Sequence, residues 1–246
     1  MKVRIALALA SFATALAASP RAQAQTTPFS PVRVIVGAER LFGLSIAKRN
    51  FVDGGNGNVT DDSRTGFGLL WRPSTFTPYQ VPRVGVDVDV WRGLTVGGTI
   101  GFYAEGGSHE TQNGNGVTTT RDSPSVRSFL FTPRVGYGLH ITPWLAFWGR
   151  LGITYYNLHT VDDEPMGQNP RSEKTTDSGL GVDLEPLFVF LPVPHLGFSV
   201  GPYADLPLSG SRSRSVTQNG VTMTPPDDKL KYTEFGLTLG MHGYFL

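Results

Sequence analysis

The stretch Val84-Gly85-Val86-Asp87-Val88-Asp89-Val90 decides the fold class, because every second residue is valine and the residues between are glycine or aspartate. Successive side chains of a β-strand point to opposite faces, so this stretch predicts a strand with one apolar face and one small or charged face. The segment from Leu94 to Glu105 repeats the pattern, with Leu, Val, Ile and Phe on one face. The two segments predict consecutive antiparallel strands that are joined by a tight turn at residues 92–93.

Six further segments alternate in the same way: residues 32–48, 129–139, 145–155, 180–190, 196–206 and 234–245. The first of them is the least regular, because Arg40 falls on the face that Val36, Ala38 and Phe42 share. A β-bulge or a snorkelling side chain would accommodate this arginine. Residues 65–71 alternate only weakly, so we assign them to a loop. The pattern therefore predicts eight strands.

The composition of the two faces favours a membrane barrel over a soluble β-sandwich, which also alternates. The polar face is dominated by Gly, Ser and Thr with isolated charges, as the crowded interior of a small barrel requires. The other face carries large aliphatic and aromatic side chains, as contact with lipid requires.

The connections between the predicted strands alternate strictly between short and long. Residues 92–93, 140–143 and 192–195 form short turns, whereas residues 49–80, 107–125, 160–177 and 209–229 form long polar loops. Outer-membrane barrels have short periplasmic turns and longer outer loops. We therefore predict an all-β protein, an eight-stranded antiparallel up-and-down transmembrane β-barrel. Asn-Gly pairs in the second and fourth long loops predict β-hairpins there.

The first 24 residues have the layout of a signal peptide: a basic start, an apolar run from Ile5 to Ala18, and Ala22-Gln23-Ala24 as a cleavage pattern. The apolar run is too short for a membrane-spanning helix, which needs about 20 residues. We expect residues 1–24 to be removed on export and residues 25–246 to form a single barrel domain.

The composition excludes several other classes of function. The chain has no cysteine, which excludes disulfides, cysteine metal sites and thiol catalysis. Its net charge of +1 argues against nucleic acid as a partner. No metal-ligand cluster or cofactor-binding motif occurs, and we expect neither a metal nor a cofactor.

These features together resemble the superfamily of small bacterial outer-membrane barrels of the OmpA/OmpX type, over residues 31–246. The resemblance implies a place in the outer membrane of a Gram-negative bacterium, contact with outer-membrane lipid and lipopolysaccharide, and a monomer. It also implies that the C-terminal strand, ending in residues 240–246, is presented to the outer-membrane assembly machinery. The superfamily has no shared activity, so the fold alone supplies no function.

Charged side chains on the polar face are the candidate site, and we place them in the lumen: Asp87, Asp89, Glu105, Arg134, Arg150, Asp183, Glu185, Asp205 and Glu234. One interpretation is an internal salt-bridge network that fills the barrel, since buried charges must be paired. The alternative is a narrow polar conduit or a solute site. We favour the network, because an eight-stranded barrel is only just wide enough for its own side chains.

Aromatic residues near the predicted membrane edges indicate girdles at the two interfaces. Trp91, Trp144, Phe190, Tyr244 and Phe245 would form the periplasmic girdle. Phe51, Tyr103, Phe129, Tyr155, Tyr156 and Tyr203 would lie towards the outer one.

No catalytic constellation is recognisable, and we assign no catalytic residue. His109 and His159 lie at or near outer loops with acidic residues close by, but no catalytic motif surrounds either of them. Arg212 and Arg214 could touch lipopolysaccharide phosphates, but we favour a solvated loop with scattered charge. We expect a non-enzymatic barrel that contributes to envelope structure or binds through its outer loops. The alternative is a small porin or carrier for a polar or hydrophobic solute.

Overall fold

The computed structural model describes residues 33–245, apart from residues 56, 70–76, 113–117, 165–170 and 194. The predicted signal peptide therefore lies outside the described residues. Nearly all of the described chain is strand: β1 (Arg33–Val52), β2 (Val59–Leu69), β3 (Arg83–Trp91), β4 (Leu94–Gln112), β5 (Thr118–Thr142), β6 (Leu145–Glu164), β7 (Arg171–Val193), β8 (Leu196–Gln218), β9 (Val221–Met223) and β10 (Asp228–Phe245), with one 3-10 turn, η1 (Pro78–Gln80). In this part of the chain no helix has the length and apolarity to cross a membrane.

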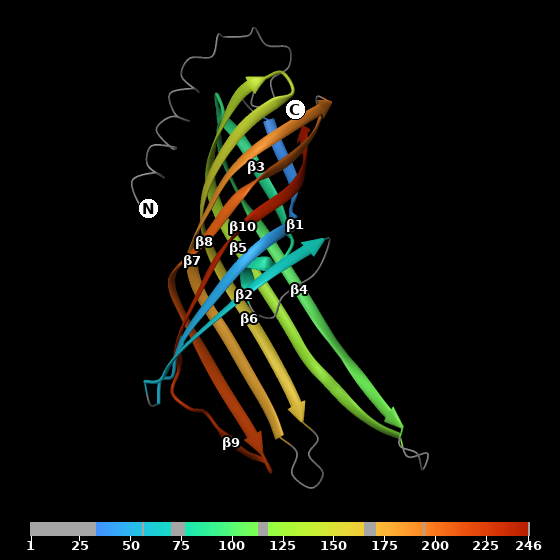
Figure 1. The fold of residues 1–246 in the computed structure, drawn as a ribbon, viewed down its shortest axis with the longest axis vertical. Coiled ribbons are helices and arrows are strands. Elements are labelled where there is room, and N and C mark those ends of the chain that lie inside the picture. Colours follow the sequence, from blue (N-terminus) through green and yellow to red (C-terminus); the bar gives the residue numbers. More distant parts are fainter. Residues whose placement is uncertain are drawn as a thin grey trace.

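Eight of these strands close into a ring, as the sequence predicts (Figure 1). Each of β3 to β8 pairs antiparallel with the next strand, and β8 pairs with β10. The ring closes because β10 pairs with β1, and β1 pairs with β3. An all-neighbour antiparallel ring of this kind is an up-and-down barrel, in which no strand edge is left over within the closed part of the wall.

The two faces of the wall are inverted relative to those of a water-soluble protein. Every strand of the ring carries exposed large apolar side chains on its outward face, such as Val86, Ile100, Phe131, Ile153 and Leu237. The side chains between them are buried in the lumen, and many of those are charged. Strand periodicity thus gives the wall an apolar exterior and places the charged side chains in the interior.

The short turns gather at one end of the barrel and the long connections at the other (upper and lower ends of Figure 1). Both Arg92 and Gly93 have positive φ, +45° and +95°, which is the backbone of a type I′ hairpin turn. At the long-loop end the strands continue as paired hairpins. β4 and β5 stay paired out to Gln112 and Thr118, with one shift of register between Glu105 and Gly107, and β8 pairs with β9 around Asn219 and Gly220. The predicted hairpins in the second and fourth long loops are therefore confirmed.

The segment that we assigned to a loop, residues 65–71, belongs in large part to a strand. β2 pairs with β1 from Val52↔Val59 to Phe42↔Leu69, below which β1 pairs with β3 from Glu39↔Arg83 onward. Because β2 and β3 both run antiparallel to β1, they run in the same direction and together occupy the place of one strand. Among the described residues η1 lies between β2 and β3 in the chain, and β2 has a strand partner on one side only.

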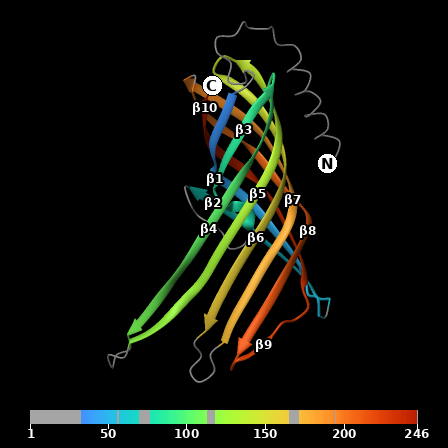
Figure 2. The same cartoon turned by 180° about the vertical axis from the view of Figure 1, so that it is seen from behind.

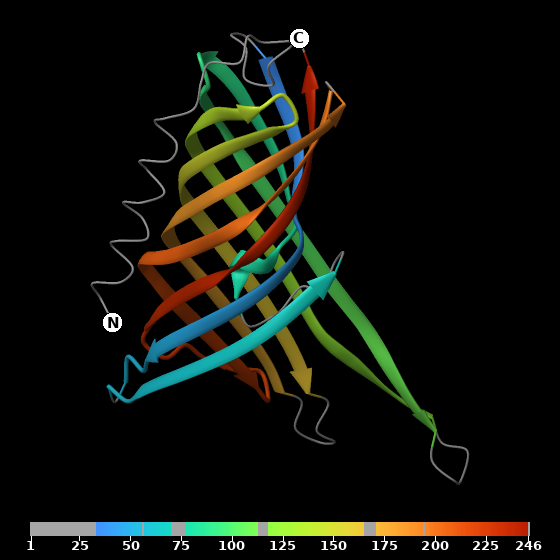
Figure 3. The same ribbon diagram turned by 45° about the horizontal axis from the view of Figure 1, so that its top comes forward.

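The barrel wall opens on the far side of β2. β3 pairs with β4 only as far as Arg83↔Gly101, so among the described residues neither β2 nor the part of β4 beyond Gly101 has a strand partner on that side. Figure 2 shows the β4–β5 hairpin leaning away from the other strands, and Figure 3 shows β2 beside β1. The long-loop half of the barrel is therefore splayed, whereas the short-turn half is closed.

The turn at Arg92-Gly93 gives a test of this fold. A Cβ added at Gly93 would lie 2.3 Å from the carbonyl oxygen of Gly138, in a backbone conformation with φ of +95°. We expect Gly93→Ala to lower the free energy of unfolding by roughly 1–3 kcal/mol. Urea titration of the barrel in lipid vesicles, followed by tryptophan fluorescence, measures this change. Gly107→Ala is the matched control, because nothing lies within 4 Å of its added Cβ. Equal stability of the two variants would contradict the turn geometry.

Candidate functional site in the barrel lumen

The lumen holds the charged residues that the sequence places there, with one exception. Asp87, Asp89, Arg134, Arg150, Asp183, Glu185, Asp205 and Glu234 are all at most 5% exposed. Glu105 is the exception: it is exposed on β4, where the hydroxyl of Tyr103 donates a hydrogen bond to it. The prediction for Glu105 is wrong because the alternation of β4 continues past Gly101, whereas the closed wall does not.

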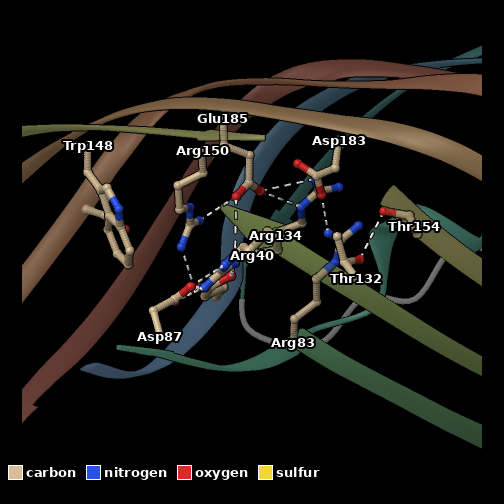
Figure 4. Close-up of polar contacts among 12 residues, drawn as sticks. Arg40, Arg83, Asp87, Thr132, Arg134, Trp148, Arg150, Thr154, Asp183 and Glu185 are labelled. Atoms are coloured by element: carbon tan, nitrogen blue, oxygen red, sulfur yellow. Dashed lines mark hydrogen bonds and ion pairs between the residues drawn. The ribbon is translucent and has the colours of Figure 1, made fainter. Parts of the chain in front are cut away.

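Two arginines and three carboxylates form one half of the network (Figure 4). Arg134 binds Glu39 through Nη1 at 2.6 Å, and its Nε donates to Asp87 at 2.9 Å. Arg150 binds the other oxygen of Glu39 at 2.6 Å and also forms an ion pair with Glu185. Glu39 thus lies between two guanidinium groups and ties β1 to β5 and β6 across the lumen.

Arg40 organises the other half, and a bulge in β1 places it there. The register between β1 and β10 shifts between Ala38 and Phe42, and Arg40 adopts a φ of +54° inside this bulge. Its side chain points into the lumen, where it binds Asp205 at 2.6 Å, Asp183 at 3.0 Å and Glu185 at 3.1 Å. The irregularity noted in the sequence is therefore a β-bulge that turns a cation from the apolar face to the polar one.

Several members of this network were missed in the sequence. Arg83 binds Asp183 at 2.5 Å, and the guanidinium carbon of Arg40 lies 4.1 Å from the centre of the Tyr203 ring. The Tyr203 hydroxyl donates to Glu234 at 2.5 Å. Arg83 could have been found, because it occupies the same face as Asp87 in the alternating stretch. Tyr203 carries the same signal, because it shares its face with Asp205 in the alternating segment 196–206.

Asp89 is buried but serves a different purpose. Its two carboxylate oxygens accept hydrogen bonds from the backbone N–H of Gly93 at 3.1 and 3.2 Å. Asp89 therefore fastens the turn at the short-turn end and takes no part in the ion pairs of the central network that the structure describes.

An apolar layer lies on each side of the charged layer. Towards the short turns the layer consists of Ile35, Ala146, Trp148, Val189, Leu191 and Tyr244. Towards the long loops it consists of Tyr79, Leu130, Tyr156, Leu230 and Tyr232. Arg150 lies over the Trp148 ring, 4.6 Å from its centre, so the charged and apolar layers are in direct contact. The two layers separate the central charges from water at both ends of the lumen.

The turn η1 completes the second apolar layer from inside the barrel. The ring of Tyr79 is fully buried and packs edge-on against Tyr156, with their centroids 5.4 Å apart. The carbonyl oxygen of Tyr79 accepts a hydrogen bond from Arg40 at 3.2 Å, and Thr77 caps the turn through its hydroxyl oxygen. The turn η1 therefore packs inside the lumen and fills it at this level.

The aromatic girdles are partly as predicted. Trp91, Trp144, Phe190 and Phe245 point outward near the short-turn end and are 41–61% exposed. The prediction for Tyr244 is wrong. Its side chain is 1% exposed and lies in the lumen, because Phe245 points outward and adjacent residues of a strand alternate. Towards the long loops Phe129 and Tyr155 are exposed, whereas Tyr156 and Tyr203 are buried in the lumen.

The loop residues that the sequence offers as candidates for catalysis or lipid binding either contact other protein residues or lie outside the described residues. Arg212 turns inward, where its Nε binds Asp177 at 2.7 Å, and Arg214 lies 3.3 Å from Glu173. His159 pairs with the hydroxyl of Thr176 at 3.0 Å. The side chain of His109 lies outside the described residues. No group of three or more potential ligands for a metal ion occurs in the described part of the chain.

Comparisons with known proteins give structural neighbours only. No protein-family model and no curated protein sequence matches this chain. Among solved structures, a major outer-membrane protein from Thermus thermophilus aligns with a TM-score of 0.49 at 12% identity, over 85% of this chain and 99% of that one. OprG from Pseudomonas aeruginosa aligns with a TM-score of 0.46 at 13% identity, over 87% and 96%. Ail from Yersinia pestis aligns with a TM-score of 0.37 at 11% identity, over 88% and 100%.

The first two neighbours are outer-membrane proteins by their descriptions. At such TM-scores the similarity adds no weight to any functional assignment. The barrel architecture rests instead on the closed ring of strand pairs within this chain.

The network gives a second test. Replacing Arg40 with alanine would leave Asp183, Glu185 and Asp205 without their shared cation in a closed lumen. We expect Arg40→Ala to lower the free energy of unfolding by about 3–5 kcal/mol, because removing one partner of a buried ion pair leaves uncompensated charge. Urea titration in lipid vesicles measures the loss.

Arg171→Ala is the matched control for Arg40→Ala. Arg171 also pairs with a carboxylate, that of Glu173 at 3.0 Å, but its side chain is 45% exposed. Its loss should cost less than about 1 kcal/mol, because water screens exposed pairs. A similar cost for both substitutions would show that the charges around Arg40 are solvated.

Proposed function

We propose that the mature chain is an outer-membrane barrel with a closed lumen, which contributes to envelope structure or binds molecules through its long-loop end. The observation that carries this proposal is the filling of the lumen by a charged layer between two apolar layers. A barrel filled in this way offers no aqueous path, so the outer end is the part that remains available to bind other molecules. We propose no catalytic role for it.

The outward surface supports the placement in a membrane. Large apolar side chains exposed on all eight ring strands form a continuous band, and a water-soluble protein rarely exposes such a surface. In lipid every backbone polar group must be satisfied within the protein, and the strand pairs of the closed part of the ring do so. Trp91, Trp144 and Phe245 border the band at the short-turn end, where an aromatic girdle would meet the membrane interface.

The length of the strands supports a role for the outer end. A tilted transmembrane strand needs about 9–11 residues. β5 has 25 residues and β7 and β8 have 23 each, so about half of each strand extends beyond the apolar band. These extensions carry Ser, Thr and charged residues on β7 and β8, in place of the Val, Leu and Phe of the band. They present a polar, strand-paired surface to the outside.

Conductance tests the closed lumen. We expect the refolded chain of residues 25–246 to insert into a planar bilayer without producing single-channel current. Glu185→Gln should also remain silent while lowering stability, because the apolar layers on either side of Glu185 stay in place. A reproducible current that changes on this substitution would instead establish a polar conduit through the charged layer.

A carrier for an apolar solute is the second candidate, and the open part of the wall favours it. Among the described residues neither β2 nor β4 beyond Gly101 has a strand partner where the two diverge, and the apolar layer around Tyr79 lies inside the same half of the barrel. A solute dissolved in the outer leaflet would meet apolar side chains there without crossing the charged layer. If this role holds, vesicles that contain the barrel transfer an apolar fluorescent dye several-fold faster than empty vesicles. Equal rates would remove this candidate.

A further inference from the structure

Three lysines lie together on the outward surface, immediately beyond the apolar band of β1 and β10. The register pairs Lys48 with Thr233, and Asn50 with Lys231, so Lys48 and Lys231 are diagonal neighbours on adjacent strands. Lys229 follows two residues further along β10, on the same face as Lys231. All three are exposed. The backbone therefore holds three ammonium groups within reach of one another.

The three ammonium groups form no ion pair within the part of the chain that the structure describes. Among those residues no ion pair involves Lys48, Lys229 or Lys231. The paired positions of β1, β2 and β10 that share this face include one carboxylate, Asp61, which accepts a hydrogen bond from Asn50 at 2.5 Å. The exposed Asp227 lies two residues before Lys229, so three lysines stand beside two carboxylates and keep hydrogen-bond donors unused.

The neighbouring surface is apolar on the side towards the short turns. Ile46 on β1 and Phe235 on β10 pair with each other and are 47% and 45% exposed, and Leu208 on β8 is exposed as well. A ligand that fits this surface has an anionic head at the level of the lysines and hydrocarbon chains along the strands below. Lysine binds phosphate as a compact point charge and attracts anionic lipid at a membrane surface.

We infer that Lys48, Lys229 and Lys231 form a binding site for the phosphate groups of lipopolysaccharide, whose acyl chains lie along Ile46 and Phe235. This inference rests on the proposed function, because it places the long-loop end in the outer leaflet. It differs from the arginines considered in the sequence: Arg212 and Arg214 face carboxylates of the protein, whereas these three lysines face outward.

Binding of purified lipid A tests the site. Wild type and the triple variant Lys48→Gln, Lys229→Gln, Lys231→Gln are refolded into phosphatidylcholine vesicles, transferred to neutral detergent and titrated with diphosphorylated lipid A, with native mass spectrometry counting bound lipid. We expect the triple variant to bind at least about tenfold more weakly, since each lysine near the surface contributes to the attraction. Raised salt should narrow the difference.

Arg171→Gln, Lys174→Gln, Arg214→Gln is the matched control, because it removes three positive charges from the β7–β8 extension. It should bind lipid A within about twofold of wild type. Equal binding by wild type and the lysine variant, or equal binding of lipid A without phosphates, would overturn the site. Equally tight binding of phosphatidylglycerol by the wild type would overturn the assignment to lipopolysaccharide.

The same samples separate this inference from the proposed function. Protease protection and sedimentation with the vesicles report whether each variant has inserted. A chain that does not insert would overturn the membrane placement and the site together. Variants that insert equally well and bind lipid A equally well would overturn the lysine site alone.

Discussion

The interior of this barrel depends on one guanidinium group, that of Arg40, and on the rule that charges in a closed lumen must be paired within the protein. β7 and β8 together bring Asp183, Glu185 and Asp205 into the lumen, and β1 supplies the cation that binds all three. Because β10 stands between β8 and β1 in the sheet, these ion pairs join parts of the wall that hydrogen bonds do not. The backbone hydrogen bonds hold neighbouring strands together, and the ion pairs across the lumen hold opposite parts of the wall at a set distance.

The same arginine links the charged layer to the segment that closes the lumen. The Tyr79 carbonyl group that Arg40 contacts belongs to η1, which lies inside the interruption between β2 and β3. β2 and β3 thus take the place of one strand of an eight-stranded ring, and the turn η1 between them lies inside the barrel. Among the described residues β2 is then paired on one side only, so the closure of the lumen and the opening of the wall have one structural origin.

Most of the architecture follows from strand periodicity and from the strict alternation of short and long connections. Both features could be recognised in the sequence. The alternation does not predict where the closed wall ends. Glu105 has the sequence position of a lumen-facing residue on β4, but it lies beyond the last residue of β4 that pairs with β3. Alternation also fails where the backbone gains residues, as at Arg40, whose side chain changes face inside the bulge. Tyr244 shows the opposite error, since parity alone would have placed it in the lumen beside an outward Phe245.

The contacts across the lumen were harder to foresee, because they depend on the relative heights of residues on strands that are not neighbours. Glu39 meets Arg134 and Arg150 only once the ring is closed and the register of its strands is set. The burial of Tyr79 in the lumen had no signal in the sequence, since a tyrosine in a long polar segment can equally well be exposed to solvent. The alternation along a strand predicts which face a residue occupies. Its partner across the lumen can be predicted only when the register of all strands in the closed ring is known.

The long strands have a consequence for how the outer end would meet another molecule. At about 3.3 Å per residue, the ten or so residues by which β6 and β7 continue beyond the exposed apolar band amount to a stiff arm of about 30 Å. Its backbone conformation is already fixed by the ladder, so a molecule that binds along it has little chain entropy to remove. Such an arm favours contact at a distance from the bilayer over wrapping around a ligand. The β4–β5 hairpin leans away from the other strands and so reaches furthest to the side of the barrel (Figure 2).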